Sequence, residues 1–123
     1  MTALLSIKAK IVTPRVEVTR DWYRDLFRLT VLEEWNDPND CGCILGLRST
    51  PGEALLEILR RSVDSDYSGM GLQFRVDDVD AFAVPAEERF RSRGPVIRPW
   101  GSRYLFFEDP NGISVVVFSG SSL

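Results

Sequence analysis

The sequence predicts an α+β fold made of two modules, each with the element order βαβββ. Short segments in which apolar and polar residues alternate, as they do in half-buried strands, recur along the 123 residues. One segment in each half instead repeats its apolar residues every three to four positions, as an amphipathic helix does. The same order of elements returns after about 60 to 64 residues. We therefore expect one domain of two modules, residues 1–61 and 70–119, joined by a linker at 62–69.

The first module is predicted to contain four strands and one helix. The strands are expected at Leu4–Val12, Thr30–Trp35, Cys43–Leu47 and Ala54–Arg60. The helix is expected at Val18–Arg28, because its apolar residues recur at intervals of four. These residues are Val18, Trp22 and Leu26, with Tyr23 and Phe27 beside them. Asp37–Asp40 and Ser49–Gly52 are rich in turn-forming residues, and Ser49–Gly52 would close a hairpin.

The second module is predicted to repeat this order. Its strands are expected at Met70–Val76, Pro95–Arg98, Ser102–Phe107 and Ile113–Phe118. A helix is expected over Val79–Arg93, with Gly94 as its C-terminal cap. Its apolar side would comprise Phe82, Ala86 and Phe90. Pro85 interrupts this pattern, so the regular helix could begin at Pro85 itself. Asp109–Gly112 has the proline and glycine positions that a type I turn prefers.

The composition excludes several classes of function. The chain contains no histidine, which excludes Ser-His-Asp and Cys-His catalysis, histidine general bases and His-ligated metals within it. A net charge of −3 and a pI near 5.0 argue against non-specific binding to nucleic acid or to an anionic membrane. No apolar run approaches the roughly 18 residues that a membrane span requires. The N-terminus also lacks the charged start and long apolar stretch of a signal peptide.

Cys41 and Cys43 are the two cysteines of the chain. Residues two apart on a strand project from the same face and would form a strained disulfide, so we expect reduced thiols and a cytoplasmic protein. Neither a CxxC motif nor a histidine accompanies them, so we do not expect them to bind a metal. No cofactor is expected.

Alternation sorts the strand residues into two sets. One set is entirely apolar, as expected of a sheet face that amphipathic helices cover. It comprises Ala9, Ile11, Leu56, Ile58, Leu72, Phe74, Val76, Ile113, Val115 and Val117. The opposite set comprises Lys8, Lys10, Leu55, Glu57, Leu59, Gly71, Gln73, Arg75, Ser114, Val116 and Phe118. Apolar walls with a few charges are typical of a ligand pocket, although a half-exposed face or a subunit interface would have the same composition.

Three motifs stand in order along the chain: DWYRDLF at Asp21–Phe27, FRVDDVDAF at Phe74–Phe82 and FEDPNG at Phe107–Gly112. With the paired βαβββ modules, these motifs resemble the vicinal oxygen chelate superfamily. That superfamily comprises glyoxalase I, extradiol dioxygenases, fosfomycin-resistance enzymes and bleomycin-resistance proteins. The resemblance covers about Leu5–Phe118. It implies strands that curl into a cup, helices outside, and a homodimer with two pockets.

The resemblance also implies where a metal would be held. Metal-dependent members carry ligands on four strands, usually His or Glu, and these positions correspond to Lys8, Glu57, Gly71 and Val116. Only Glu57 offers a ligand atom, whereas a catalytic divalent ion needs about three protein ligands. Metal-dependent glyoxalase or dioxygenase activity is therefore not expected. Lys8 and Glu57 could instead form an ion pair in the cup with Arg75 nearby, or Lys8 could contact a carboxylate or phenolate of a ligand.

Aromatic residues supply further candidates for ligand contact, because flat rings stack on planar molecules. In this family, the positions that line or rim the cup correspond to Trp35, Trp100, Tyr104, Phe107 and Phe118. Each of these rings could equally serve in ordinary packing. With Lys8, Glu57 and Val116, the candidate ligand-binding set is completed by Lys10, Gln73 and Arg75. The acidic net charge would suit a cationic ligand.

The leading hypothesis is a metal-free, dimeric protein that binds or sequesters a small, partly aromatic molecule, as bleomycin-resistance proteins do. No nucleic-acid or membrane partner is expected. The rival hypothesis is a metal-independent isomerase or lyase that uses Glu57 as general base and Lys8 or Arg75 as electrostatic stabiliser. A third possibility is a degenerate module whose cup is filled by its own side chains and which serves only as an interaction partner.

Overall fold

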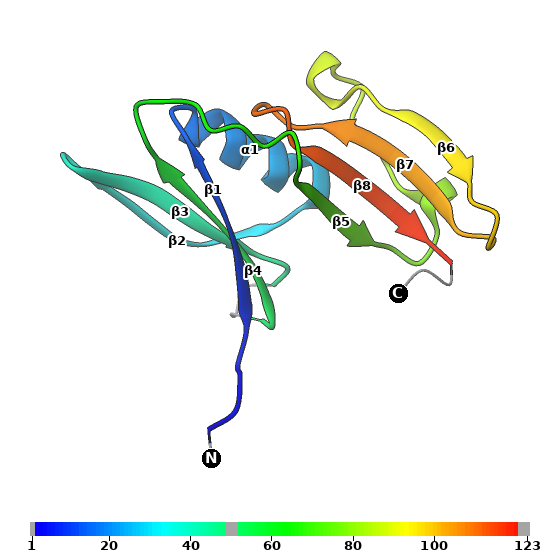
Figure 1. The fold of residues 1–123 in the computed structure, drawn as a ribbon, viewed down its shortest axis with the longest axis horizontal. Helices are drawn as coiled ribbons and strands as arrows, with labels where there is room; N and C mark the ends of the chain where they lie inside the picture. The colour runs from blue at the N-terminus through cyan, green and yellow to red at the C-terminus, as the bar shows by residue number, and fades with distance from the viewer. Residues whose placement is uncertain (1, 49–51, 121–123) are drawn as a thin grey trace. The chain divides into compact units, whose positions relative to one another are not determined.

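Two four-stranded mixed sheets are formed by the alternating segments in the computed structural model, which describes residues 2–48 and 52–120 (Figure 1). The chain divides into two compact units, Met1–Ser65 (the first unit) and Asp66–Leu123 (the second unit), with one sheet in each. In both sheets the first strand pairs in parallel with the last, and the other neighbours are antiparallel. The predicted α+β class is confirmed.

The sheet of the first unit has the strand order β1-β4-β3-β2. Its strands are β1 (Ile7–Thr13), β2 (Thr30–Asp37), β3 (Asp40–Gly46) and β4 (Ala54–Arg60). All four predicted strands are present, but β1 begins later than expected, because Leu4 and Leu5 are almost fully exposed and lie before the sheet. The predicted turn at Ser49–Gly52 lies mostly outside the described residues. The antiparallel pairing of β3 with β4 agrees with a hairpin.

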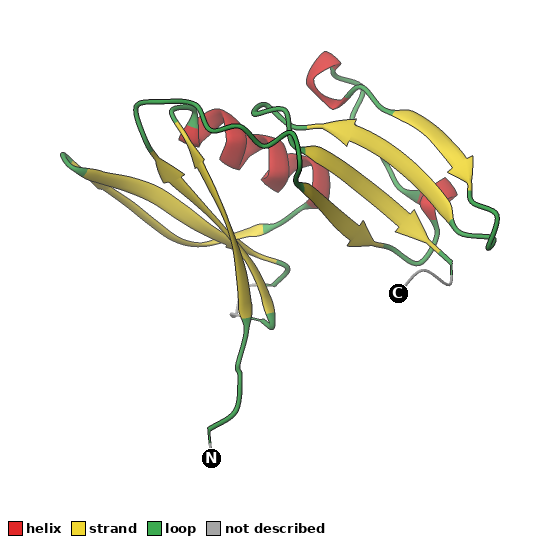
Figure 2. Cartoon of the chain, in the orientation of Figure 1, coloured by secondary structure: helices red, strands yellow, loops and turns green. Residues whose placement is uncertain are grey.

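The helix α1 (Val16–Phe27) buries one stripe of side chains and packs against β3 and β4 (Figure 2). The buried residues are Val16, Thr19, Trp22, Tyr23 and Leu26. The assignment of Val18 to this stripe is wrong, since 56% of it is exposed. Thr19 lies near the centre of the buried stripe, and Val18 points about 100° away from Thr19 around the helix axis. Within the described ranges, no helix has the length and apolar content needed to cross a membrane.

The sheet of the second unit has the equivalent order β5-β8-β7-β6. Its strands are β5 (Gly71–Arg75), β6 (Arg93–Ile97), β7 (Arg103–Glu108) and β8 (Ser114–Ser119). All four predicted strands are present, with ends shifted by one or two residues. The alternation of apolar residues therefore predicts the strands of both units well.

The predicted helix over Val79–Arg93 is wrong. Two short 3₁₀ turns, η1 (Val79–Ala81) and η2 (Glu88–Phe90), occupy this segment instead. Pro85 has no N–H to donate, its ring clashes with the preceding turn, and it disfavours helical geometry at the residue before it. Gly94 consequently caps no helix, and lies within β6 with φ +107°. Of the predicted apolar side, Phe90 is buried, Phe82 is half-buried and Ala86 is exposed.

The predicted turn at Asp109–Gly112 is confirmed. The Gly112 N–H donates to the Asp109 carbonyl oxygen at 3.1 Å. The buried Asp109 carboxylate accepts two further bonds through Oδ1, from the N–H of Asn111 at 2.7 Å and from that of Ile113 at 2.9 Å. This turn joins β7 to β8, and so sets the register of the strands that carry the aromatic residues described below.

Candidate ligand-binding site

One face of the first sheet carries Lys8, Lys10 and Glu57. Residues paired across strands point to the same side of a sheet, so the register defines this face. It comprises Lys8, Lys10, Val12, Glu33, Trp35, Gly42, Ile44, Leu55, Glu57 and Leu59, and we call it the Glu57 face. On the opposite side, Leu45 and Ile58 are fully buried on the strands that α1 covers. The predicted division of these strand residues between two faces is confirmed.

Lys8 and Glu57 form an ion pair on this face. Lys8 Nζ lies 2.7 Å from Glu57 Oε1, and the side chains are 43% and 11% exposed. Lys8 pairs in register with Leu55, so it lies diagonally across from Glu57 on the parallel strands β1 and β4. A buried carboxylate requires a counter-charge or hydrogen-bond donors. The ion pair hypothesised from the sequence is therefore present, with the ammonium on the more exposed side.

Trp35 lies on the same face, at the β2 edge of the sheet. Its Nε1–H donates to Asp40 Oδ1 at 2.9 Å. Its ring lies close to Gly42, because a Cβ atom built on Gly42 would come within 2.8 Å of Trp35 Cζ2. Glycine at this position therefore lets the indole lie across β3, held by a hydrogen bond at its polar end.

One face of the second sheet is rich in aromatic and arginine side chains. Its register brings together Gly71, Gln73, Arg75, Arg93, Val96, Tyr104, Phe106, Glu108, Ser114, Val116 and Phe118, and we call it the aromatic face. The predicted candidates Gln73, Arg75, Tyr104, Val116 and Phe118 all lie here. The set that alternation predicts for these strands is therefore confirmed as one face.

Three rings form the centre of this face. Tyr104 and Phe118 are cross-strand partners whose ring centroids lie 5.7 Å apart at 45°. Tyr104 and Phe106 follow each other along β7 with centroids 6.1 Å apart at 52°. Phe118 and its neighbour Val116 are buried, whereas Tyr104 and Phe106 are half-buried. The result is an apolar surface on which Tyr104 and Phe106 are the rings partly exposed to solvent.

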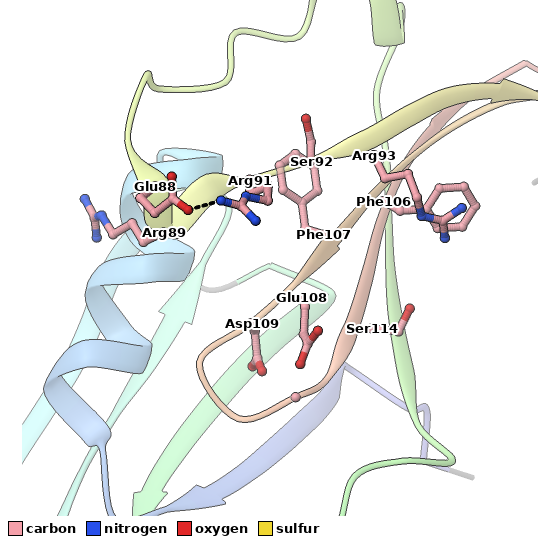
Figure 3. A pocket seen from close by; sticks show the side chains of 11 residues that line it. Glu88, Arg89, Arg91, Ser92, Arg93, Phe106, Phe107, Glu108, Asp109 and Ser114 are labelled. Atoms are coloured by element: carbon pink, nitrogen blue, oxygen red, sulfur yellow. Dashed lines mark hydrogen bonds and ion pairs between the residues drawn. The ribbon is translucent and has the colours of Figure 1, made fainter.

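Two guanidinium groups cover these rings. The Arg93 guanidinium carbon lies 4.4 Å from the centroid of Phe106, as Figure 3 illustrates. That of Arg98 lies 4.8 Å from the centroid of Tyr104 and 5.5 Å from that of Phe106. Arginine stacks on aromatic faces because its planar cation is attracted by the ring quadrupole and is weakly hydrated.

Sequence reasoning missed Phe106, Arg93 and Arg98. Alternation could have found Phe106, because it stands two residues after Tyr104 on the same strand and must share its face. The two arginines gave no comparable signal. Arg93 was assigned to a helix that does not form, and Arg98 follows β6.

Two of the predicted aromatic candidates lie elsewhere. Phe107 pairs with Val115 on the opposite face, is 5% exposed, and contacts the edge of Phe82 with centroids 6.5 Å apart. Its side chain lies on the other side of the sheet from that of Tyr104, since residues three apart on a strand point to opposite sides. Trp100 lies between β6 and β7, beside a turn closed by the bond from Gly101 N–H to the Arg98 carbonyl, and is 58% exposed.

A pocket of about 700 Å³ lies at one end of the aromatic face (Figure 3). It is lined by Glu88, Arg89, Arg91, Ser92, Arg93, Phe106, Phe107, Glu108, Asp109, Gly112 and Ser114. Arg91 and Glu88 form an ion pair on its wall. Arg93 and Phe106 belong to both the pocket and the aromatic face. A planar molecule on the rings would therefore have space to extend towards Glu108 and Ser114.

The residues that the family resemblance places at metal-ligand positions do not fit a metal ion. Within the first unit, Lys8 carries a cation and Glu57 Oε1 already contacts it. Within the second, Gly71 and Val116 share a face but have no donor atoms. Among residues 2–48 and 52–120, no group of three or more cysteine, aspartate or glutamate side chains could hold a metal.

The two cysteines are buried in the first unit. Cys41 and Cys43 are free and buried, on the side of β3 that faces α1. Burial raises the pKa of the Cys43 thiol to about 11, so the thiol is protonated near neutral pH. Because the thiolate is the reactive and metal-binding form, Cys43 is an inert core residue.

Comparisons with known proteins agree with this architecture. The family model of the Glyoxalase/Bleomycin resistance protein/Dioxygenase superfamily matches residues 7–117. A search of curated proteins gave no match. Among solved structures, the chain is similar to TnmS3, an antibiotic binding protein from Streptomyces sp. CB03234, with 22% identity and a TM-score of 0.76 over 98% of this chain and 99% of that one.

Two further structures have the same fold. A glyoxalase/bleomycin resistance protein from Catenulispora acidiphila has 22% identity and a TM-score of 0.63, over 95% of this chain and 99% of that one. A glyoxalase family protein from Enterococcus faecalis has 21% identity and a TM-score of 0.65, over 94% and 96% of the two chains. The matched family model spans nearly the whole of both sheets, and the chain belongs to the Glyoxalase/Bleomycin resistance protein/Dioxygenase superfamily.

Proposed function

We propose that this protein binds and sequesters a small, planar aromatic molecule without the help of a metal ion. The observation that carries the proposal is the aromatic face, on which Tyr104, Phe106 and Phe118 present adjoining rings beside a pocket of about 700 Å³. Rings of this kind stack on a flat ligand at little cost in side-chain entropy. The aromatic face is evidence for binding that is separate from the fold, because the fold of this superfamily serves many activities.

The first unit supports a metal-free mode of binding. The Glu57 carboxylate, which stands at a metal-ligand position of the family, contacts an ammonium group, and the corresponding residues of the second unit have no donor atoms. TnmS3 is described as an antibiotic binding protein, and its resemblance in fold makes antibiotics sensible first ligands to test. We further propose that the protein is a homodimer. We also propose that it acts in a reducing compartment such as the cytoplasm, because the thiols of Cys41 and Cys43 are free.

Titration with planar polycyclic antibiotics, followed by intrinsic tryptophan fluorescence, tests this proposal. Saturable quenching is expected for planar compounds and not for aliphatic ones of similar mass. Phe106→Leu keeps the apolar volume but removes the ring, and is expected to weaken binding about fivefold. Ile97→Ala serves as control, since Ile97 is exposed on the opposite side of β6. A panel without any saturable response would refute the proposal.

A metal-independent enzyme that uses Glu57 as general base is the second candidate. The observation that favours it is the juxtaposition of a buried carboxylate and an ammonium group at 2.7 Å, which could act as base and electrostatic stabiliser. The two candidates differ in the fate of the bound molecule. A sequestering protein returns it unchanged when the complex is denatured and analysed by chromatography. An enzyme converts it, and Glu57→Gln then abolishes conversion while binding persists.

A further inference from the structure

We propose that the ligand is an anion: a planar aromatic molecule with a carboxylate, phenolate or sulfonate group, bound by Arg75, Arg93 and Arg98 around the rings of the aromatic face. This inference rests on the proposed binding function and adds the chemical class of the ligand. It reverses the expectation, drawn from the net charge of −3, that a cation would be favoured.

The three arginines lie on or beside the two edge strands of this face. In the sheet order β5-β8-β7-β6, Arg75 on β5 pairs with Phe118, which in turn pairs with Tyr104. Arg93 on β6 pairs with Phe106, and Arg98 follows the same strand. The rings on the two central strands thus have an arginine of the same face on each edge strand. An aromatic ligand on these rings would lie between positive charges on both sides.

Among the residues that the structure describes, these guanidinium groups have no carboxylate partner. Within residues 2–48 and 52–120, no aspartate or glutamate oxygen lies within 4.0 Å of a side-chain nitrogen of Arg75, Arg93 or Arg98. Arginines elsewhere do form such ion pairs; they include Arg15, Arg20, Arg24, Arg60, Arg89, Arg91 and Arg103. No acid of the described part of the chain therefore neutralises the charges of the aromatic face by an ion pair.

The stacking of Arg93 and Arg98 leaves their donors suited to an anion. A guanidinium group that lies over a ring keeps its N–H groups in its own plane, where they can donate in pairs to a carboxylate or sulfonate. Arg98 Nε is buried and has no hydrogen-bond partner within residues 2–48 and 52–120, so contact with the rings holds this side chain in place of a polar anchor. The outer side of a stacked guanidinium also offers a flat surface for a ligand ring.

Glu108 is the one acid in the set of residues that defines the aromatic face. Glu108 is exposed, pairs with Ser114, and follows Phe106 on β7 on the side away from Tyr104. It forms no ion pair with Arg93 in the described part of the chain. Charges farther away than about 8 to 10 Å are largely screened in solution, so the local arginines outweigh the net charge of the whole chain.

Three anthracene derivatives of the same shape test the sign of the charge on the full-length protein. Anthracene-9-carboxylate is anionic, 9-anthracenemethanol is neutral, and 9-(aminomethyl)anthracene is cationic. We expect the carboxylate to bind about tenfold more tightly than the alcohol at low salt, and the amine to bind most weakly. Added salt should weaken binding of the carboxylate and leave that of the alcohol nearly unchanged.

Variants assign the effect to the arginines. Arg93→Gln and Arg98→Gln are each expected to weaken carboxylate binding about tenfold and alcohol binding less than about twofold, while Arg98→Lys retains most of the preference for the anion. Arg103→Gln is the matched control, because Arg103 adjoins Tyr104 on β7 but lies on the opposite face, paired with Asp80. Thermal unfolding of each variant checks that it is folded.

The possible failures are distinguishable. If the alcohol or the amine binds as tightly as the carboxylate, the ligand is not selected as an anion, and the proposed binding function stands. If the glutamine variants weaken all three probes equally, the arginines act by packing, and the charge inference is again wrong. If none of the three probes binds, both this inference and the proposed function are overturned.

Discussion

Gly42 is the residue that gives the Trp35 indole its place on the Glu57 face. A Cβ atom at Gly42 would lie 2.5 Å from the Ile58 carbonyl oxygen and 2.8 Å from Trp35 Cζ2. The Ile58 oxygen belongs to the backbone of β4, so it cannot move without disturbing the pairing of β3 with β4. Close approach to backbone and ring, and not turn geometry, is therefore the reason for glycine at this position.

We expect Gly42→Ala to destabilise the protein by about 1–3 kcal/mol, because overpacking forces the strands or the ring to shift. Urea unfolding followed by tryptophan fluorescence measures this loss. Gly52→Ala is the control, since a Cβ atom at Gly52 meets nothing within 4 Å, and its stability should lie within about 0.5 kcal/mol of the original. Equal unfolding midpoints for the two variants would contradict the packing of Trp35 over Gly42.

For single residues, the two-residue period of a strand correctly predicts which face of the sheet each side chain occupies. It placed Lys8 and Glu57 on one face, and the structure joins them in an ion pair. Phe107 was grouped with Tyr104 by analogy with related cups, against that period, and it lies on the other face. The contacts of Arg98 could not be predicted, because a long flexible side chain beyond the end of a strand has no fixed direction in the sequence pattern.

Among the connecting elements, the turn between β7 and β8 is held by one buried carboxylate. Asp109 Oδ1 accepts the N–H groups of both Asn111 and Ile113, and Ile113 is fully buried. Buried amide N–H groups are costly to leave without an acceptor. The sequence identified this turn from its proline and glycine, but the pattern gave no sign that the aspartate side chain closes it.

We expect Asp109→Ala to lower the free energy of unfolding by about 2–4 kcal/mol, because two N–H groups lose their acceptor. Asp109→Asn keeps one carbonyl oxygen and should lose less than half as much. Chemical denaturation monitored by circular dichroism provides the measurement. Glu108→Ala, which alters an exposed neighbour, is the control and should change stability by less than about 0.5 kcal/mol. An alanine variant as stable as this control would refute the capping role of Asp109.

Of the two predicted helices, the first forms and the second does not, and the difference has a physical reason. The segment that forms α1 has proline only before its first turn, so its apolar stripe can wind into a regular helix against β3 and β4. The segment after β5 has comparable apolar spacing, but Pro85 stands within it and leaves two 3₁₀ turns. Spacing predicted the burial of Phe90 but not the exposure of Ala86, and Pro85 prevents a regular helix in this segment.

For the whole molecule, the sheet topology supports the repeat seen in the sequence. The orders β1-β4-β3-β2 and β5-β8-β7-β6 are equivalent, with a parallel pair between the first and last strand of each unit. Turn residues and alternation predicted the strands of this repeat, because both act locally along the chain. The chemistry of the aromatic face was less predictable, since it depends on rings and arginines from several strands meeting in three dimensions.

The proposed metal-independent function leads to a prediction for the whole chain. It has no histidine, and of the residues at the family's metal-ligand positions only Glu57 offers an oxygen, which contacts Lys8 Nζ at 2.7 Å. Protein dialysed against EDTA should therefore bind a planar aromatic ligand with a Kd within about twofold of that of untreated protein. An excess of Zn²⁺, Ni²⁺ or Mn²⁺ should raise the Tm by less than about 1 °C, whereas a saturating aromatic ligand should raise it clearly, as the positive control. Loss of binding in EDTA that one metal restores would contradict this prediction and place the chain with the metal-dependent members of its superfamily.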